Sequence, residues 1–78
     1  MMIKILFFAR LQEEIGKDSL NIEKAGLTVN QLKQWLEKEH GLHSLDQTMA
    51  AVNEDYADGS EVLKEGDTVA LIPPVSGG

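Results

Sequence analysis

The chain has 78 residues, with seven basic against thirteen acidic side chains and a formal net charge of -6. This length suits one domain with one core and is too short for a cofactor-binding fold with its own deep cleft. The absence of cysteine excludes disulfides, zinc–thiolate sites, thiol nucleophiles and a side-chain persulfide. The acidic balance argues against nucleic acid and anionic small molecules, and it favours protein partners with basic or apolar surfaces.

Hydropathy gives no reason to expect a membrane protein. The longest apolar runs are residues 5–9 and 69–75, which are far too short to cross a bilayer. No export signal is visible, because no basic segment followed by an apolar core opens the chain. We therefore expect a cytoplasmic protein, which the lack of cysteine also fits.

The first third of the chain predicts two strands with a short helix between them. Residues 2–8 form an apolar run of β-formers, which is typical of an internal strand. Leu11 and Ile15 stand four apart and are followed by Gly16, which predicts a short helix with a glycine stop. Alternation of apolar and polar residues at 20–22 predicts the second strand.

The clearest predicted element is a helix over Val29–His40. Thr28 at the N-cap and Gln31 three residues later fit a capping box, and Gly41 supplies a left-handed residue at the other end. Apolar side chains recur at helical spacing, so the helix has one face for the core. The residues on that face are Val29, Leu32, Trp35 and Leu36.

The C-terminal half predicts short strands joined by turns. Residues 49–53 form an apolar strand, and Tyr56 begins a brief return strand after a turn. Asp58 and Gly59 give a second turn signal. Residues 68–72 form the last strand, which ends at two prolines because proline cannot donate to a sheet ladder.

One long helix and several short strands predict the fold class. The economical packing is a small mixed sheet on one main helix, an α+β fold of the β-grasp type. We expect residues 1–72 to form this domain. Residues 73–78 are expected to form an extended, flexible tail that two prolines stiffen at its start.

Alternation also predicts an apolar patch on the sheet face away from the helix. Leu6, Phe8 and Ile72 project from that face. Such a patch is typical of a partner-binding surface, with Tyr56 at its rim. The alternative is that surface loops cover these side chains.

Internal residues offer no clear catalytic site. His40 and His43 have a spacing that a metal pair can use, but Gly41 breaks the helix between them and no third ligand is near in sequence. We therefore expect histidines at a helix end and no metal site. No glycine-rich phosphate loop follows a strand, and no Ser–His–Asp constellation can be assembled.

The C-terminal segment carries the chemical signal. It consists of Pro73, Pro74, Val75, Ser76, Gly77 and Gly78. A frayed terminus is the plain alternative, but this tail leaves directly from a strand and ends on two glycines. Because glycine has no Cβ, such an end can thread a narrow channel. Any sulfur that the chain carries must sit on the terminal carboxyl group as a thiocarboxylate, since no cysteine is available.

Three segments resemble the small, sulfur-carrying subunit of molybdopterin synthase, a ubiquitin-like β-grasp family. They are residues 3–9 (IKILFFA), 50–53 (AAVN) and 67–78 (DTVALIPPVSGG). The complete Pro-Pro-Val-Ser-Gly-Gly terminus is the specific part of the match. Gly-Gly alone is shared with thiazole-pathway sulfur carriers and protein modifiers. Both stay open as alternatives, as does a purely interacting β-grasp module.

The resemblance implies a mechanism centred on Gly78. An adenylyltransferase of the ubiquitin-activating type would adenylate it with ATP, and a sulfur donor protein would convert it to a thiocarboxylate. The loaded tail would then enter the large subunit, with Phe8 and Ile72 at the subunit interface. There the sulfur would pass to cyclic pyranopterin monophosphate, a step of molybdenum cofactor biosynthesis. Two small and two large subunits form the family's complex, and the carrier itself would bind no cofactor.

Overall fold

The computed structural model describes residues 2–24, 26–42 and 45–73. The strands are β1 (Ile3–Phe7), β2 (Ser19–Ile22), β3 (Met49–Val52), β4 (Asp55–Ala57) and β5 (Thr68–Ile72). The helices are α1 (Arg10–Ile15), α2 (Val29–His40) and the 3-10 helix η1 (Leu45–Gln47). The predicted order of the strands, α1 and α2 is confirmed, with strand ends shifted by a residue or two, and η1 was not predicted.

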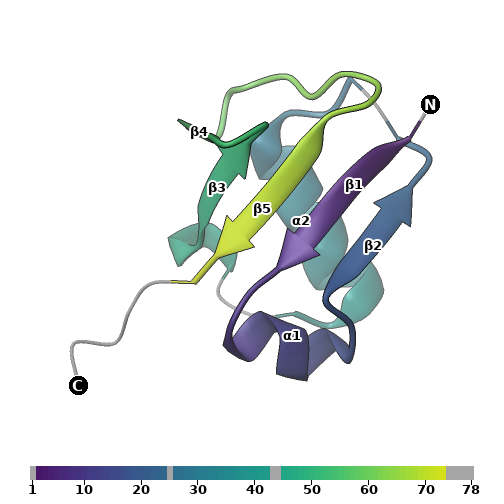
Figure 1. Cartoon of the computed structure of the whole chain (residues 1–78), viewed down its shortest axis with the longest axis vertical. Helices are drawn as coiled ribbons and strands as arrows, with labels where there is room; N and C mark the ends of the chain where they lie inside the picture. The colour runs from purple at the N-terminus through teal and green to yellow at the C-terminus, as the bar shows by residue number, and fades with distance from the viewer. Residues whose placement is uncertain (1, 25, 43–44, 74–78) are drawn as a thin grey trace.

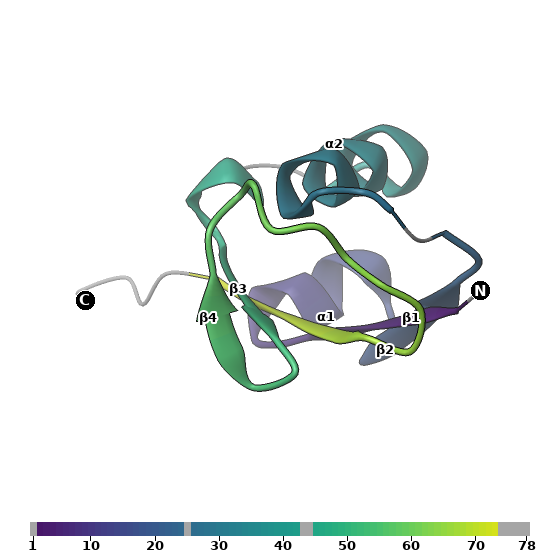
Figure 2. The same ribbon diagram turned by 90° about the horizontal axis from the view of Figure 1, so that it is seen from above.

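The five strands form one mixed sheet in the order β2–β1–β5–β3–β4 (Figure 1). β1 and β5 run parallel, and the other neighbours run antiparallel. The first and last strands of the chain therefore lie side by side inside the sheet. Figure 2 shows α2 on one side of this sheet and, among the described residues, no helix covering the other. The predicted α+β, ubiquitin-like β-grasp fold is confirmed.

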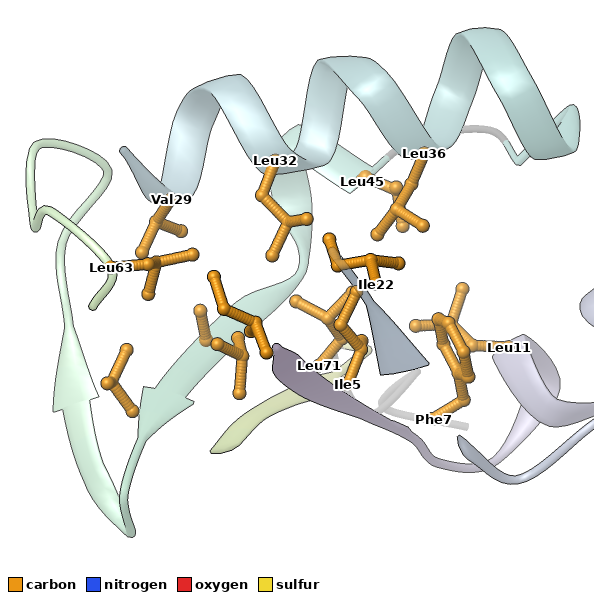
Figure 3. Packing of buried hydrophobic residues seen from close by; sticks show 14 of the residues in the cluster. Ile5, Phe7, Leu11, Ile22, Val29, Leu32, Leu36, Leu45, Leu63 and Leu71 are labelled. Carbon is orange, nitrogen blue, oxygen red and sulfur yellow. The ribbon is translucent and has the colours of Figure 1, made fainter. Parts of the chain in front are cut away.

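The core fills the space between α2 and the sheet (Figure 3). Alternate residues of β1 and β5 point toward the helix, as the pleat requires, and their side chains are almost fully buried. The strand residues are Ile3, Ile5, Phe7, Val69 and Leu71, and those from α2 are Val29, Leu32 and Leu36. The intervening strand residues must therefore point to the opposite, helix-free face.

Both predicted caps of α2 are present. The Thr28 Oγ1 accepts a hydrogen bond from the Gln31 backbone N–H at 3.1 Å, and the Gln31 Oε1 accepts one from the Thr28 N–H at 2.9 Å. Gly41 ends the helix in the left-handed conformation, with φ of 67°. These reciprocal bonds satisfy donors that would otherwise be orphaned at a helix end.

The loop before β5 is hydrogen-bonded to the N-terminal end of α2. The N–H groups of Val29 and Asn30 donate to the carbonyls of Glu61 and Gly59, at 2.9 and 3.0 Å. An isolated bridge between Thr28 and Val62 extends this pairing. The first N–H groups of α2 are thus used within the chain, so this helix end offers no free site for an anion.

Trp35 lies at the edge of the predicted apolar face of α2. The structure leaves it partly buried, packed against the edge of the core. At 3.6 residues per turn, Trp35 lies about a quarter turn from the centre of the stripe. Its ring instead meets the His40 ring edge-on at 5.4 Å, and the Lys24 Nζ lies 5.7 Å from its centroid.

None of the helices in the described ranges is long and apolar enough to span a membrane. His40 lies on the exposed last turn of α2, as expected for a residue at a helix end. His43 lies outside the described residues. Over those residues, no group of three or more His, Cys, Asp or Glu side chains could hold a metal ion.

Candidate functional site

The helix-free face of the sheet carries the predicted apolar patch. Its middle row follows the strand register, with Leu6 beside Ala70, Ala70 beside Ala51 and Ala51 beside Tyr56. Leu6 and Ala70 are half-buried, and Tyr56 is 73% exposed. A continuous band of apolar side chains therefore crosses four strands, with Tyr56 at its outer edge as predicted.

A second row lies at the end of β5. Met49 pairs with Ile72, and Phe8 directly follows Phe7, whose register partner is Leu71. Phe8 is 42% exposed and Met49 is 48% exposed, whereas Ile72 is half-buried. The described residues therefore leave Phe8 and Met49 substantially exposed on this face.

A hollow of about 500 Å³ lies over the middle row, and of the second row Phe8 alone lines it. Its lining residues are Leu6, Phe8, Ala51, Asn53, Glu54, Thr68 and Ala70. The floor is apolar, and the polar groups stand on the side of the β3–β4 turn. We call this surface, with Met49, Ile72 and Tyr56, the docking face. A concave apolar floor with a polar rim suits a protein partner.

Hydrogen bonds hold the polar rim in place. Asn53 and Glu54 form the β3–β4 turn with φ values of 51° and 74°. The Asn53 Nδ2 donates to the Asp67 Oδ1 at 2.9 Å, and its Oδ1 accepts from the Thr68 N–H at 3.0 Å. The Asp67 Oδ2 accepts from the Lys64 N–H at 2.7 Å. This last bond, and then the Asn53 amide, lower the pKa of Asp67 below its ordinary value.

The tail begins at the docking face. β5 ends at Ile72, and Pro73 is buried, so the chain stays against the domain for one residue beyond the strand. The predicted site residues beyond this point lie outside the described residues. They are Pro74, Val75, Ser76, Gly77 and Gly78. Their predicted roles, and the boundary at residue 72, stay predictions.

Two contributors to the docking face were missed from the sequence. Met49 and Ala51 share it with Leu6, Phe8 and Ala70, and the outward position of Ala70 follows from alternation along the last strand. Alternation within the predicted strands contains this signal, because Ala50 and Val52 are core residues and their neighbours must face outward. Small alanines are easily overlooked, although they make room for the hollow.

The ThiS family's sequence profile matches residues 5–78. The chain belongs to the ThiS family. Among its relatives, the molybdopterin synthase sulfur carrier subunit of Escherichia coli (strain K12) is 36% identical over 81 residues. That alignment covers 99% of this chain and 100% of the relative. The resemblance seen in the sequence is therefore confirmed.

Solved structures agree on the fold of this ThiS-family chain. SAMP1 from Haloferax volcanii aligns with a TM-score of 0.83 and 28% identity, covering 100% of both chains. A chain from the complex of subunits 1 and 2 of the Helicobacter pylori 26695 molybdopterin-converting factor aligns with a TM-score of 0.71. It is 30% identical, again over 100% of both chains.

Proposed function

We propose that this protein is the sulfur-carrier subunit of a molybdopterin synthase and that Gly78 carries the sulfur as a thiocarboxylate. The observation that best supports the proposal is the position of the docking face. It surrounds the end of β5, where the tail begins. A partner bound there is within reach of the terminal glycines, so docking and delivery of the tail become one event.

The partner on the docking face is the large subunit of the synthase. An apolar floor that includes Leu6 and Phe8 favours association by removing apolar surface from water. The Helicobacter pylori relative is described as a complex of subunits 1 and 2. By analogy, the carrier contacts the large subunit through Leu6, Phe8, Ile72, Tyr56 and Pro73. Residues 74–76 extend into the channel of that subunit.

The chemistry begins with activation of the Gly78 carboxylate. One carboxylate oxygen attacks the α-phosphorus of ATP, pyrophosphate leaves, and an acyl-adenylate forms on an adenylyltransferase of the ubiquitin-activating type. A hydrosulfide equivalent from a sulfur donor protein then attacks the acyl carbon. AMP leaves with the bonding electrons of the C–O bond, and the product is the Gly78 thiocarboxylate.

Sulfur delivery takes place in the large subunit. The thiocarboxylate sulfur attacks a carbon of cyclic pyranopterin monophosphate, and a C–O bond at that carbon breaks, so that the oxygen group leaves with the bonding electrons. Water then cleaves the acyl C–S bond. The Gly78 carboxylate returns, and the sulfur stays on the pterin. Gly77 and Gly78 contribute the narrow, Cβ-free end that this channel requires. The carrier holds no cofactor of its own. The reaction takes place in the cytoplasm, in a complex of two carriers and two large subunits.

The direct test is a high-resolution mass spectrum of the protein isolated from its source cells. The C-terminal peptide must be sequenced, because methionine oxidation adds nearly the same nominal mass as exchanging oxygen for sulfur. Sulfur on Gly78 is the expected result. Gly78 joined to target lysines, with no thiocarboxylate, would instead identify a protein modifier.

The choice between sulfur-carrier pathways needs a binding measurement. We expect the purified carrier to bind a molybdopterin synthase large subunit and not a thiazole synthase. Binding to the thiazole synthase alone would move the assignment to the thiazole pathway. The Phe8→Ala variant is the control, because it removes docking-face area while its neighbour Phe7 keeps the core filled.

A further inference from the structure

The docking face carries an exposed thioether. The Met49 side chain is 48% exposed and lies opposite Ile72, the last residue of the strand from which the tail departs. Met49 also stands two residues before Ala51 on the same side of β3, and Ala51 lines the hollow. A partner that covers this face therefore also covers the Met49 sulfur.

Met49 contributes little to the fold. Its strand neighbours Ala50 and Val52 both belong to the core, whereas Met49 does not. A chemical change at its sulfur occurs in water on the free carrier and leaves the core packing untouched. The same change in the complex would lie in a desolvated, apolar contact.

We infer that Met49 is an oxidation-sensitive docking residue, so that its conversion to the sulfoxide weakens binding of the large subunit. The identity of that partner rests on the proposed function. In the reaction, the thioether sulfur attacks one oxygen of hydrogen peroxide. An S–O bond forms, the O–O bond breaks, and water leaves after proton transfer. The sulfur is oxidised by two electrons, and the peroxide is reduced.

Oxidation of Met49 should weaken binding because the sulfoxide oxygen is solvated on the free carrier and desolvated in the complex. The sulfoxide oxygen is a strong hydrogen-bond acceptor that water satisfies on the free carrier. A partner that covers Met49 beside Ile72 removes this water, and burying a polar oxygen that has lost its hydrogen bonds is costly. We expect the Kd for the large subunit to rise about tenfold or more. Reduction of the sulfoxide would restore the original Kd, because this oxidation is reversible.

The chain offers an internal control. Met2 is 44% exposed, close to the value for Met49, and alternation puts it on the same side of the sheet as Leu6. It lies four residues before Leu6, however, which is about 13 Å along the strand. Oxidation at Met2 should therefore proceed without affecting docking. With no cysteine in the chain, peroxide has no thiol to attack.

The experiment uses the full-length carrier and the purified large subunit. Wild type, Met49→Leu and Met2→Leu are treated with dilute hydrogen peroxide and quenched, and each sulfoxide is quantified by peptide mass spectrometry. Leucine keeps the apolar volume and removes the sulfur. Isothermal titration calorimetry then gives the Kd before and after treatment. On treatment, the Kd of wild type and of Met2→Leu should rise about tenfold, whereas the Kd of Met49→Leu should change by no more than about twofold.

Two further measurements test whether a polar group at residue 49, and not unfolding, weakens the binding. The untreated Met49→Gln variant places a polar group at the site without peroxide and should weaken binding in the same direction. The Tm of the oxidised wild type should match that of the untreated protein. A fall in Tm that accounts for the lost binding would overturn the inference, because the carrier would then be unfolding.

The outcomes separate this inference from the proposed function. Untreated wild type that does not bind the large subunit contradicts the proposed function itself. Untreated protein that binds, and whose Kd does not change when Met49 is fully oxidised, contradicts only the inference. Equal loss of binding in wild type and Met49→Leu would likewise reject it, because the sensitive group would then lie elsewhere.

Discussion

Two neighbouring phenylalanines have opposite roles because the strand is pleated. Phe7 is 1% exposed and packs in the core, whereas Phe8 is 42% exposed on the docking face. Phe7→Ala removes a fully buried ring and should cost about 3–5 kcal/mol of unfolding free energy. Phe8→Ala should lower the Tm only slightly. Its main effect should be weaker binding of the large subunit, because it removes contact area from that face.

This pair is tested by thermal unfolding and calorimetric binding on the same samples. Phe7→Ala serves as the matched control for ring removal at the adjacent position. A large drop in Tm for Phe8→Ala would place Phe8 in the core. An unchanged Kd would remove Phe8 from the interface.

Asp67, which is hydrogen-bonded to the docking-face rim, should make the stability of the fold depend on pH. Its pKa lies below the ordinary 3.8 because the Lys64 N–H, and then the Asn53 amide, donate to its carboxylate. A depressed pKa in the folded state contributes stability that is present above pH 3.8 and is lost as the pH falls through the folded pKa. We expect Asp67→Asn to be less stable than wild type at neutral pH and to lose less stability on acidification.

The measurement is the Tm from about pH 6 down to about pH 2, a range that extends below the ordinary pKa of an aspartate side chain. Glu13→Gln, on the exposed side of α1, makes the same change in net charge and is the control. We expect its acid slope to match that of wild type. Equal slopes for wild type and Asp67→Asn would show that the Asp67 hydrogen bonds contribute nothing to acid stability.

At the scale of elements, α2 is joined to the loop before β5 by backbone hydrogen bonds. The Asn30 N–H donates to the Gly59 carbonyl at 3.0 Å, and a Cβ built on Gly59 would overlap the Asn30 side chain. Gly59→Ala should therefore lower the Tm. The double variant with Asn30→Ala should recover most of that loss, because it removes the atoms that the new methyl group meets.

A double-mutant cycle by thermal unfolding decides whether this contact is responsible. Asn30→Ala alone is the reference, and Asn30 is exposed, so its own cost should be small. A double variant no more stable than Gly59→Ala would mean that the glycine is needed for backbone reasons instead. The cycle thus separates crowding from conformational preference.

Local signals decided which elements the sequence could predict. The bounds of α2 follow from Thr28, Gln31 and Gly41, whose cap interactions span only a few residues. Trp35 packs against the core from the edge of the predicted face, and helical spacing alone does not say how deeply a side chain at that edge is buried. Ala9 was not anticipated either, since its φ of 54° is unusual for a residue other than glycine.

Docking-face residues were predicted where alternation within one strand was sufficient. They were missed where their placement depends on the register between strands that are distant in sequence. Leu6 and Phe8 were assigned from β1 alone. The pairing of Met49 with Ile72 depends on how β3 aligns with β5, and no local pattern fixes that alignment. The Asn53–Asp67 bond also joins residues 14 apart through side chains, so it emerges only in the folded chain.

For the whole molecule, a net charge of -6 should govern how the carrier finds its partner. Complementary charge raises the association rate, and salt screens it, with a Debye length of about 10 Å at 0.1 M. We expect the association rate with the large subunit to fall as salt rises, while the dissociation rate changes little because the docking face is apolar. Stopped-flow measurements at several salt concentrations test this. An association rate independent of salt would exclude steering by charge.

Deletion of Gly78 separates the fold from the chemistry. The core and the hydrogen-bonded rim lie within residues 2–73, so the deletion should leave the Tm unchanged. Binding of the large subunit should weaken at most modestly, because the docking face remains. Sulfur transfer should be abolished, since the next carboxyl group is one residue short of the site of activation. A reconstituted assay for molybdopterin formation measures this, with Lys38→Ala on the exposed side of α2 as the control. A deletion variant that still forms molybdopterin would show that Gly78 does not carry the sulfur.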